Sequence, residues 1–433
     1  MKYFKTFLLG SFLSASLTSS AALAEEIRML INQSPWLNGF IAMVDEYEKQ
    51  SDNTIELDVT PFGGMLEKTR NSIRGSEARY DLIALNAGGL AEHYSSGFMK
   101  PLTEIDPNFK LEENLLKFGG SVGWDRANKG FSSDGEILGV PINGNVQVLY
   151  YRTDLYEAAG LTPPETWDEL IENAKALADE NTYGYIPRAS RGSIMYNFTS
   201  CLLSHGGSYF ADPSAGDYNV TIASKEALNA LNTYIRLGQE AGPPNPGSIA
   251  QAELIQLLST GKAAQAIAVI AAYANLNNPN SSIVAGKIGT ALIPSAPGYP
   301  HASSAGHWQA GIPKNAAKEK QVAALHFLNW FQQKEQQLFY VRAGGVPVRK
   351  DLAESGGDDP AFDFIPAFSA NASVSQMISP LPEGSQIKDA ISVFLNQAVI
   401  GELTPTEALN KSADAMHQIM IDAGYKVSEP SKL

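Results

Sequence analysis

The segment "GVPINGNVQVLYYRTDL", Gly139 to Leu155, decides how this chain is organised. Two apolar runs, Ile137–Val140 and Val146–Tyr151, have the length and composition of β-strands. A short polar insert at 142–145 separates them. The insert is either a hairpin turn or a crossover, at which the chain leaves one domain, passes a ligand and enters another.

The N-terminal residues 1–24 are typical of a secretory signal peptide. Lys2 and Lys5 precede a mostly apolar stretch at 7–17, and "ALA" at 22–24 is an A-x-A cleavage signal. We therefore predict cleavage after Ala24 and export of the mature chain. No later apolar run reaches the roughly 18 residues that a membrane-spanning helix needs.

The composition favours an acidic protein of two to three domains without disulfides. The 433 residues carry a formal net charge of −14, which repels nucleic acid and anionic lipid. The single cysteine, Cys201, cannot form an internal disulfide. Its surroundings, "FTSCLLSHGG", are typical of a buried helix face, so we interpret Cys201 as a core residue rather than a catalytic thiol.

Strands and helices alternate in the first part of the mature chain. Expected strands are Glu26–Asn32, "TIELDVT" at 54–60 and "YDLIAL" at 80–85, and expected helices are 36–49 and 65–75. This alternation predicts an α/β fold with a mostly parallel sheet flanked by helices.

Helices dominate after Tyr151. The segment "TPPETWDELIENAKALAD" contains a capping box, in which Thr166 caps a helix and Glu169 reaches back. Strands are expected in "QAIAV", "KIGTALIP" and "HWQAGIP". Further helices are expected at 225–241, 318–340, 387–400 and 404–423.

The motif at 119–123 and the six histidines could indicate catalysis or metal binding. "GGSVG" at 119–123 matches the G-x-S-x-G nucleophile elbow, which needs a strand before the serine and a helix after it. "LEENLLKF" at 111–118 has helical spacing instead, so we interpret the motif as a glycine-rich loop after a helix. The six histidines show no metal-binding spacing, and we expect no metal or cofactor. His307, next to Trp308, is a candidate hydrogen-bonding wall residue.

Planar polar and aromatic side chains recur where the expected strands end. In open α/β sheets, ligands bind beyond the carboxyl ends of the strands. Amides pair with vicinal hydroxyls, and aromatic faces cover the C–H side of a sugar ring. The residues in these positions are Asn32, Gln33, Trp36, Phe62, Asn86, Asn143 and Asn145.

Four segments resemble the extracellular solute-binding protein family 1, the sugar-binding subunits of ABC importers. They are "YDLIALNAGGLAEHYSSGFMKPLTEI", "GEILGVPINGNVQVLYYRTDLYEAAGLTPPETWDEL", "LLSTGKAAQAIAV" and "AGIPKNAAKEKQVAALHFLNWFQQKEQQ". The second is the most specific, because its G-V-P, L-Y-Y-R-x-D-L, A-G-L and P-P-x-T-W-D-E-L elements follow in order. The resemblance covers nearly all of the mature chain.

The resemblance implies a two-lobe periplasmic-binding-protein fold of type II, in which each lobe is a mixed sheet flanked by helices. The N-lobe would comprise 25–141 plus 309–345, and the C-lobe 145–306 plus 348–433. Three crossovers would act as hinges, near 142–144, 307–308 and 346–347. The opening segment would then be the first crossover, and the lobes would close around a ligand.

The resemblance also implies ligand contacts. It supports the positions after the first and third strands, and Asn145 in the first crossover. "PRASRGS" resembles an Arg-Gly element of the polyol-binding subgroup, so Arg188 or Arg191 is a candidate donor. The remaining candidates are Tyr196, which follows on the next helical turns, Tyr273 after the "QAIAV" strand, Trp308 in the second crossover and Gly345 in the third.

We therefore expect a monomeric periplasmic receptor, not an enzyme, that delivers a small sugar or polyol to a membrane permease. Two alternatives remain at this point. One is a binder of an anionic sugar derivative or other small polar solute, favoured by Arg188 and Arg191. The other is a secreted carbohydrate-active enzyme, which needs two carboxylates around the scissile bond.

Overall fold

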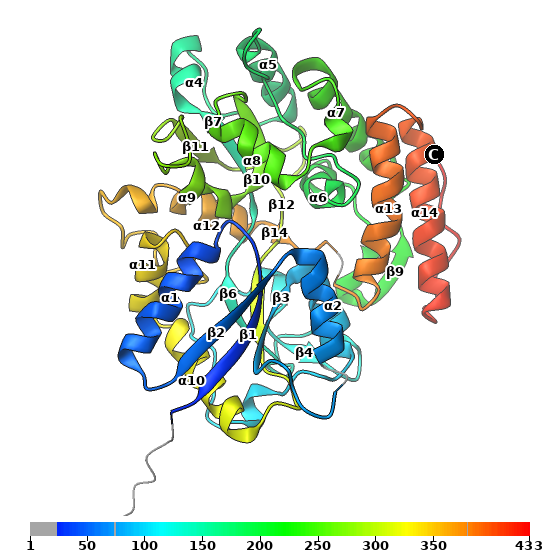
Figure 1. The fold of residues 1–433 in the computed structure, drawn as a ribbon. Coiled ribbons are helices and arrows are strands. Elements are labelled where there is room, and N and C mark those ends of the chain that lie inside the picture. Colours follow the sequence, from blue (N-terminus) through cyan, green and yellow to red (C-terminus); the bar gives the residue numbers. More distant parts are fainter. Residues whose placement is uncertain (1–23, 73–74, 379) are drawn as a thin grey trace, which may run out of the picture.

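The computed structural model describes residues 24–433 except 73–74 and 379. Figure 1 shows two bodies of strands and helices joined through a middle zone. The predicted signal peptide lies outside the described residues, apart from Ala24. Within the described part of the chain, no helix has both the length and the apolar character needed to cross a membrane.

The N-lobe is built on a five-stranded mixed sheet in the order β2-β1-β3-β13-β6. β1 pairs in parallel with β2 and β3, whereas β13 pairs antiparallel with β3 and β6. The core strands β1 and β3 are almost wholly buried, as their continuous apolar runs predict. The strands are β1 (Glu26–Asn32), β2 (Thr54–Thr60), β3 (Leu82–Asn86), β6 (Val140–Asn143) and β13 (Trp308–Gly311).

Helices from two distant parts of the sequence, 37–95 and 318–342, cover this sheet (Figure 1). The apolar stripe of α1, with Phe40, Met43 and Tyr47 buried, packs toward Phe327 and Phe331 of α10. The helices of this lobe are α1 (Leu37–Gln50), α2 (Phe62–Ser72), α3 (Leu90–Ser95), α10 (Lys318–Phe331) and α11 (Lys334–Arg342).

The C-lobe has a smaller sheet in the order β10-β7-β11, antiparallel throughout. The expectation of a mixed sheet therefore holds for the N-lobe only. Its strands are β7 (Gln147–Arg152), β10 (Gln265–Val269) and β11 (Ile288–Ala291). Its helices are α4 (Thr153–Ala159), α5 (Trp167–Leu177), α6 (Ile194–Ser204), α7 (Lys225–Ala241), α8 (Gln251–Ser259), α9 (Tyr273–Leu276), α12 (Ile365–Ser373), α13 (Gly384–Val399) and α14 (Pro405–Asp422).

Several local predictions for this lobe are confirmed. Thr166 and Glu169 form the capping box at the start of α5. Cys201 is fully buried in α6, and α7 spans the predicted 225–241. Gly261 adopts a φ of +70° between α8 and β10, a conformation that favours glycine.

The opening segment is a crossover and not a hairpin, because β6 and β7 belong to different sheets. Gly144 donates its backbone N–H to the carbonyl of Val346, and Gly306 donates to the carbonyl of Asn145. Residues in or directly beside the three predicted hinges are therefore hydrogen-bonded to one another. A Cβ atom on Gly144 would lie 2.0 Å from the carbonyl oxygen of Pro347, so only glycine fits here.

The segment at 111–118 corrects a sequence-based expectation. It is not helical, because the backbone N–H of Leu116 donates to the carbonyl of Val348 and Lys350 donates to Asn114. These tertiary hydrogen bonds hold the segment as a turn at 113–114 followed by a single bridge from Leu115 to Arg349, despite its helical spacing. The expected helix at 318–340 is likewise divided into α10 and α11 at Gln332 and Gln333.

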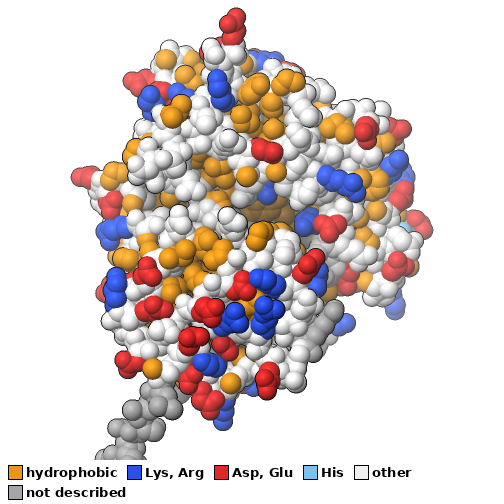
Figure 2. Space-filling model, in the orientation of Figure 1, with side chains coloured by type: hydrophobic (Ala, Val, Ile, Leu, Met, Phe, Trp, Pro, Cys, Tyr) orange, Lys and Arg blue, Asp and Glu red, His pale blue; other side chains and the backbone are white. Residues whose placement is uncertain are grey.

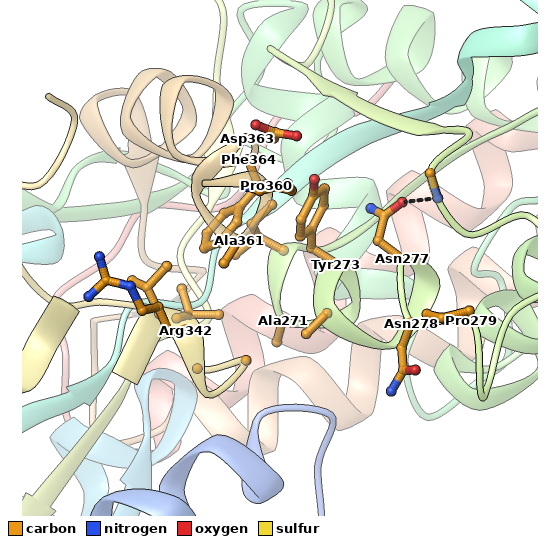
Figure 3. Close-up of a pocket in the computed structure, with 17 residues that line it drawn as sticks. Ala271, Tyr273, Asn277, Asn278, Pro279, Arg342, Pro360, Ala361, Asp363 and Phe364 are labelled. Atoms are coloured by element: carbon orange, nitrogen blue, oxygen red, sulfur yellow. Dashed lines mark hydrogen bonds between the residues drawn. The ribbon is translucent and has the colours of Figure 1, made fainter. Parts of the chain in front are cut away.

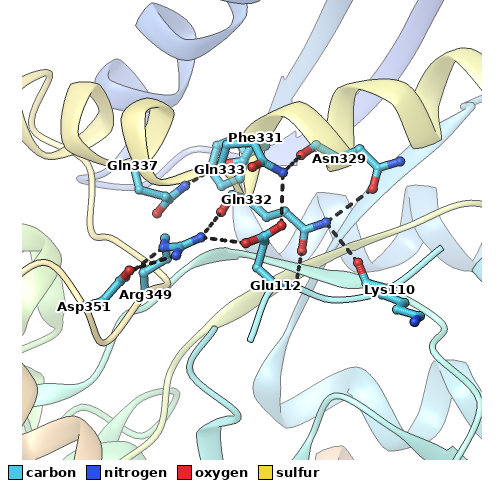
Figure 4. A network of polar contacts seen from close by, with 9 residues as sticks. All are labelled: Lys110, Glu112, Asn329, Phe331, Gln332, Gln333, Gln337, Arg349 and Asp351. Atoms are coloured by element: carbon cyan, nitrogen blue, oxygen red, sulfur yellow. Dashed lines mark hydrogen bonds and ion pairs between the residues drawn. The ribbon is translucent and has the colours of Figure 1, made fainter. Parts of the chain in front are cut away.

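A polar network ties the chain just after the third crossover to the N-lobe (Figure 4). Arg349, whose side chain is 5% exposed, donates to Asp351 through Nε and Nη2 and to the carbonyl of Gln332 through Nη1. It also pairs with Glu112 at 3.3 Å. Since Glu112 and Gln332 belong to the predicted N-lobe, we propose that the C-lobe resumes beyond residue 351 rather than at 348.

Candidate functional site

A cavity of about 270 Å³ lies between the lobes, where the crossovers meet. The N-lobe contributes the chain after β1, the start of α2 and the chain after β3, and the C-lobe contributes residues before and within α6, α8 and α13. Figure 2 shows a hollow between the lobes with hydrophobic side chains inside it. The volume is slightly below the range of about 300–1,000 Å³ that is typical of small-molecule sites, which favours a small ligand.

Three aromatic side chains from separate N-lobe elements form one wall of the cavity. The ring centroids of Trp36 and Trp308 are 5.9 Å apart, and Phe62 packs edge-on against Trp308 at 6.1 Å. Trp308 reaches this wall because it begins β13, which pairs with Asn86 of β3 and Asn143 of β6. Such flat apolar faces suit the C–H surface of a ring or polyol.

The cavity also gathers buried polar atoms without a protein partner. Among the described residues, six such atoms belong to lining side chains: Asn32 Oδ1, Ser34 Oγ, Trp36 Nε1, Arg188 Nε, Arg188 Nη1 and Tyr196 Oη. Buried polar groups are normally hydrogen-bonded, and each unpaired one carries a desolvation cost. Their concentration around one cavity indicates a site for a polar ligand.

Arg188 and Tyr196 form the C-lobe wall. The guanidinium carbon of Arg188 lies 5.2 Å from the centroid of the Tyr196 ring. Burial raises the pKa of the Tyr196 hydroxyl and lowers the pKa of Arg188, which is nevertheless cationic near neutral pH. The ring of Tyr196 fits only because residue 306 is glycine.

Nine of the predicted site residues line this cavity. Asn145 also ties the first crossover to the chain after β10, because its Oδ1 accepts a hydrogen bond from the backbone N–H of Ala271 at 3.2 Å. The nine are Asn32, Gln33, Trp36, Phe62, Asn86, Asn145, Arg188, Tyr196 and Trp308.

Asn143 and His307 lie beside the cavity but do not line it. Asn143 is fully buried, and its Oδ1 accepts from the backbone N–H of Asn145, which stabilises the turn of the first crossover. His307 is also fully buried, stacked on Phe118 at 4.5 Å and hydrogen-bonded to the Oγ of Ser121 at 2.7 Å. Both therefore shape the crossovers from inside the N-lobe.

The Ser121–His307 pair is not a nucleophile and base in an elbow. Ser121 follows a 3-10 turn at Phe118–Gly120, with neither the preceding strand nor the following helix that the motif requires. Its backbone carbonyl accepts from Gln309, which in turn accepts from the hydroxyl of Tyr94. Burial lowers the pKa of His307 to about 3, so the imidazole is neutral near pH 7.

Tyr273 and Gly345 line a different cavity, of about 330 Å³, which shares only Ala271 with the first (Figure 3). Tyr273 packs against Phe364 at 5.0 Å. None of the buried unpaired polar atoms among the described residues belongs to a side chain lining this second cavity. The larger volume therefore does not make it the stronger candidate.

Arg191 lines neither of these two cavities, because its side chain is exposed in the turn before α6. The structure thus separates the two arginines of "PRASRGS". Sequence reasoning missed the lining residues Gln251 and Lys388, which come from α8 and α13. No signal in the neighbouring sequence marks either residue as part of a site. Lys388 illustrates the reason: α13 lies more than 200 residues from α2 in sequence, yet folding brings Lys388 to 5.9 Å from the Phe62 ring centroid.

No group of three or more His, Cys, Asp or Glu side chains suited to a metal ion occurs among the described residues. Among the described residues, the lining of the candidate site has no Asp or Glu. Its chemistry is that of amide, hydroxyl, indole, guanidinium and ammonium groups.

Comparisons with known proteins agree with this arrangement. The family model described as bacterial extracellular solute-binding protein matches residues 33–338. A probable amino-acid ABC transporter periplasmic-binding protein of Sinorhizobium fredii is 26% identical over 68% of this chain and 66% of its own length. A mannitol-binding protein of Pseudomonas aeruginosa is 22% identical over 87% of this chain and 89% of its own length.

Among solved structures, maltose-bound MalE3 of T. maritima superposes with a TM-score of 0.79. It is 23% identical, and the match covers 92% of this chain and 100% of that one. The expected two-lobe type II fold is therefore confirmed.

Proposed function

Because this chain belongs to the family of bacterial extracellular solute-binding proteins, we propose that it captures a small sugar or polyol in the cavity between its lobes. In this proposal the chain works in the periplasm and delivers the ligand to the membrane permease of an ABC importer. ATP hydrolysis belongs to another subunit, since no Walker motif occurs in this sequence. The similarity to a mannitol-binding protein and to a maltose-bound structure supports this ligand class.

One observation carries the proposal: flat aromatic faces and unpaired polar atoms converge on the same cavity. Trp36, Phe62 and Trp308 offer stacking surfaces, while Asn32 and Tyr196 offer hydrogen-bonding atoms that have no protein partner. A sugar or polyol presents apolar C–H groups and hydroxyls within the same few ångströms. It therefore matches both kinds of surface at once.

The two lobes supply different parts of the site, so a ligand that contacts both favours the closed arrangement. The N-lobe contributes the aromatic wall, and the C-lobe contributes Arg188 and Tyr196. Asn145 lies in the crossover between them and is tied to the C-lobe through Ala271. Closure would exclude water from the stacked ring and strengthen its polar contacts.

A carbohydrate-active enzyme fits the cavity less well. Glycoside hydrolysis in most families uses two carboxyl groups flanking the scissile bond. The lining of this cavity, as far as the structure describes it, includes neither aspartate nor glutamate. The site is therefore suited to binding without bond cleavage.

A ligand screen tests the proposal. The purified mature chain is heated with pentitols, hexitols, monosaccharides, disaccharides and a set of amino acids, and the midpoint of unfolding is recorded. A ligand that binds only the folded chain raises this midpoint, and at equal concentration a tighter ligand raises it more. We expect a rise with at least one hydroxyl-rich compound. A rise with amino acids alone would overturn the proposed ligand class.

A further inference from the structure

The guanidinium group of Arg188 has no counter-ion in the cavity wall. Among the described residues, its side chain makes no hydrogen bond and no ion pair, and its Nε and Nη1 are buried. Its one recorded partner is the ring face of Tyr196. The backbone of Arg188 is held independently, because its carbonyl accepts a 2.7 Å hydrogen bond from the hydroxyl of Tyr234.

The charge balance of the cavity is one-sided. The described residues that line it include two cationic side chains, Arg188 and Lys388, and no carboxylate. This holds although Asp and Glu outnumber Lys and Arg by 46 to 32 in the whole chain. Lys388 pairs at 3.4 Å with Asp389, but that carboxylate is 76% exposed and does not line the cavity.

The position of α6 adds to the positive potential. This helix of 11 residues begins at Ile194, and Gly192, Ser193 and Met195 around its first turn all line the cavity. The N-terminal end of a helix carries partial positive charge. No acidic side chain occupies the first turn of α6 to offset it.

Arg188 is half-buried, but two of its guanidinium nitrogens are buried without a partner, which is costly for a cation, and an anion from the ligand offsets that cost. Neutral hydroxyls would leave the charge of Arg188 uncompensated. A carboxylate, sulfonate or phosphate forms charge-assisted hydrogen bonds, which are roughly twice as strong as neutral ones. The neighbouring aromatic wall would still contact the apolar part of the same molecule.

We infer that the ligand is a hydroxyl-rich solute that carries an acidic group, and that Arg188 binds this group with Lys388 as a second, outer cation. This inference rests on the proposed function, because it names a subclass of sugars and polyols. Arg188 would therefore make the protein bind an acidic sugar or polyol more tightly than the corresponding neutral compound.

Titration calorimetry with matched ligands tests the inference. Neutral pentitols, hexitols and hexoses are each compared with the corresponding aldonate, uronate and terminal phosphate. We expect the acidic member of at least one set to bind about tenfold more tightly than its neutral counterpart. Its affinity should fall as NaCl is raised, because salt screens charge pairs. The carboxylate and phosphate arms identify which anion the site takes.

The outcomes separate the two claims. If neutral compounds bind and none of their acidic counterparts binds more tightly, the inference is overturned while the proposed function stands. If neither neutral nor acidic members bind, the proposed function fails, and the inference fails with it.

Two substitutions and one control locate the charge effect. Arg188→Gln should remove the preference for the acidic member, with a loss of about tenfold for the acid and a much smaller loss for the neutral partner. Lys388→Gln should reduce the same preference less, and it tests the claim if Arg188→Gln does not fold. Arg191→Gln, at the exposed arginine of the same segment, should leave both affinities unchanged. Equal losses for acid and neutral ligands in Arg188→Gln would overturn the inference.

Discussion

Gly306 lies so close to Tyr196 that a Cβ atom at residue 306 would be 1.3 Å from the phenolic oxygen. Gly306 directly precedes the predicted second crossover at 307–308, and Tyr196 belongs to α6 of the C-lobe. The contact therefore couples the position of a cavity side chain to the backbone that joins the lobes. A residue with any side chain at 306 would force the tyrosine ring to move.

We accordingly expect Gly306→Ala to weaken ligand binding. The overpacking costs about 1–3 kcal/mol, and it displaces the ring that lies against Arg188. Calorimetry and thermal unfolding of the variant measure the two effects separately. Gly63→Ala is a matched control, since an added methyl at 63 meets nothing within 4 Å. Wild-type affinity in Gly306→Ala would contradict a role for Tyr196 in the site.

Trp308→Ala should weaken binding by at least about 1 kcal/mol if the indole stacks on the ligand. The side chain is 7% exposed, so its removal also lowers the free energy of unfolding. Affinity must therefore be measured well below the unfolding midpoint of the variant. Trp308→Phe, which keeps a flat face, should retain more affinity than alanine. Equal affinity in wild type and Trp308→Ala would remove this residue from the site.

Gly144→Ala should destabilise the fold at the meeting point of the crossovers. The added methyl would lie 2.0 Å from the carbonyl oxygen of Pro347 and close to the ring of Phe368. We expect the free energy of unfolding to fall by about 1–3 kcal/mol, as for other overpacked sites. Urea unfolding measures it, with Gly63→Ala again as the control. An unchanged midpoint would show that the crossovers separate more easily than their contacts indicate.

His307 should make the protein less stable in acid. Burial lowers its pKa to about 3, whereas an exposed histidine has a pKa of about 6.5. Between these values the unfolded chain binds a proton that the folded chain does not. The free energy of unfolding therefore falls as the pH drops from about 6.5 toward 3, by up to about 1.4 kcal/mol per pH unit.

His307→Gln tests this pH dependence. The variant lacks the titrating ring, so its free energy of unfolding should fall less steeply than that of wild type between about pH 6 and pH 4. Urea unfolding at several pH values gives both slopes. The absolute stability of the variant does not matter to the test, because only the slopes are compared. Parallel slopes would show that His307 takes up its proton over the same pH range in the folded chain as in the unfolded chain.

Much of the local structure could be predicted from short stretches of sequence. The strand β1 and the helix α7 occur where the apolar periodicity places them, and Thr166 caps α5 as its capping box predicts. These features depend on hydrogen bonds and side-chain spacings within a few residues. The segment at 111–118 shows the limit, because distant backbone partners at 348–350 override its helical spacing.

The sequence by itself determined the alternation of elements and most of the strand-end positions that line the cavity, whereas the residues at 142–145 left a hairpin and a crossover open until the sheet topology decided for the crossover. Only the tertiary structure decided that Arg188 lines the cavity while Arg191 is exposed, that His307 turns into the N-lobe, and that Lys388 of α13 reaches Phe62. The physical reason is the range of the forces involved. Local periodicity sets the elements, whereas burial, missing counter-ions and contacts between remote segments exist only after the chain has folded.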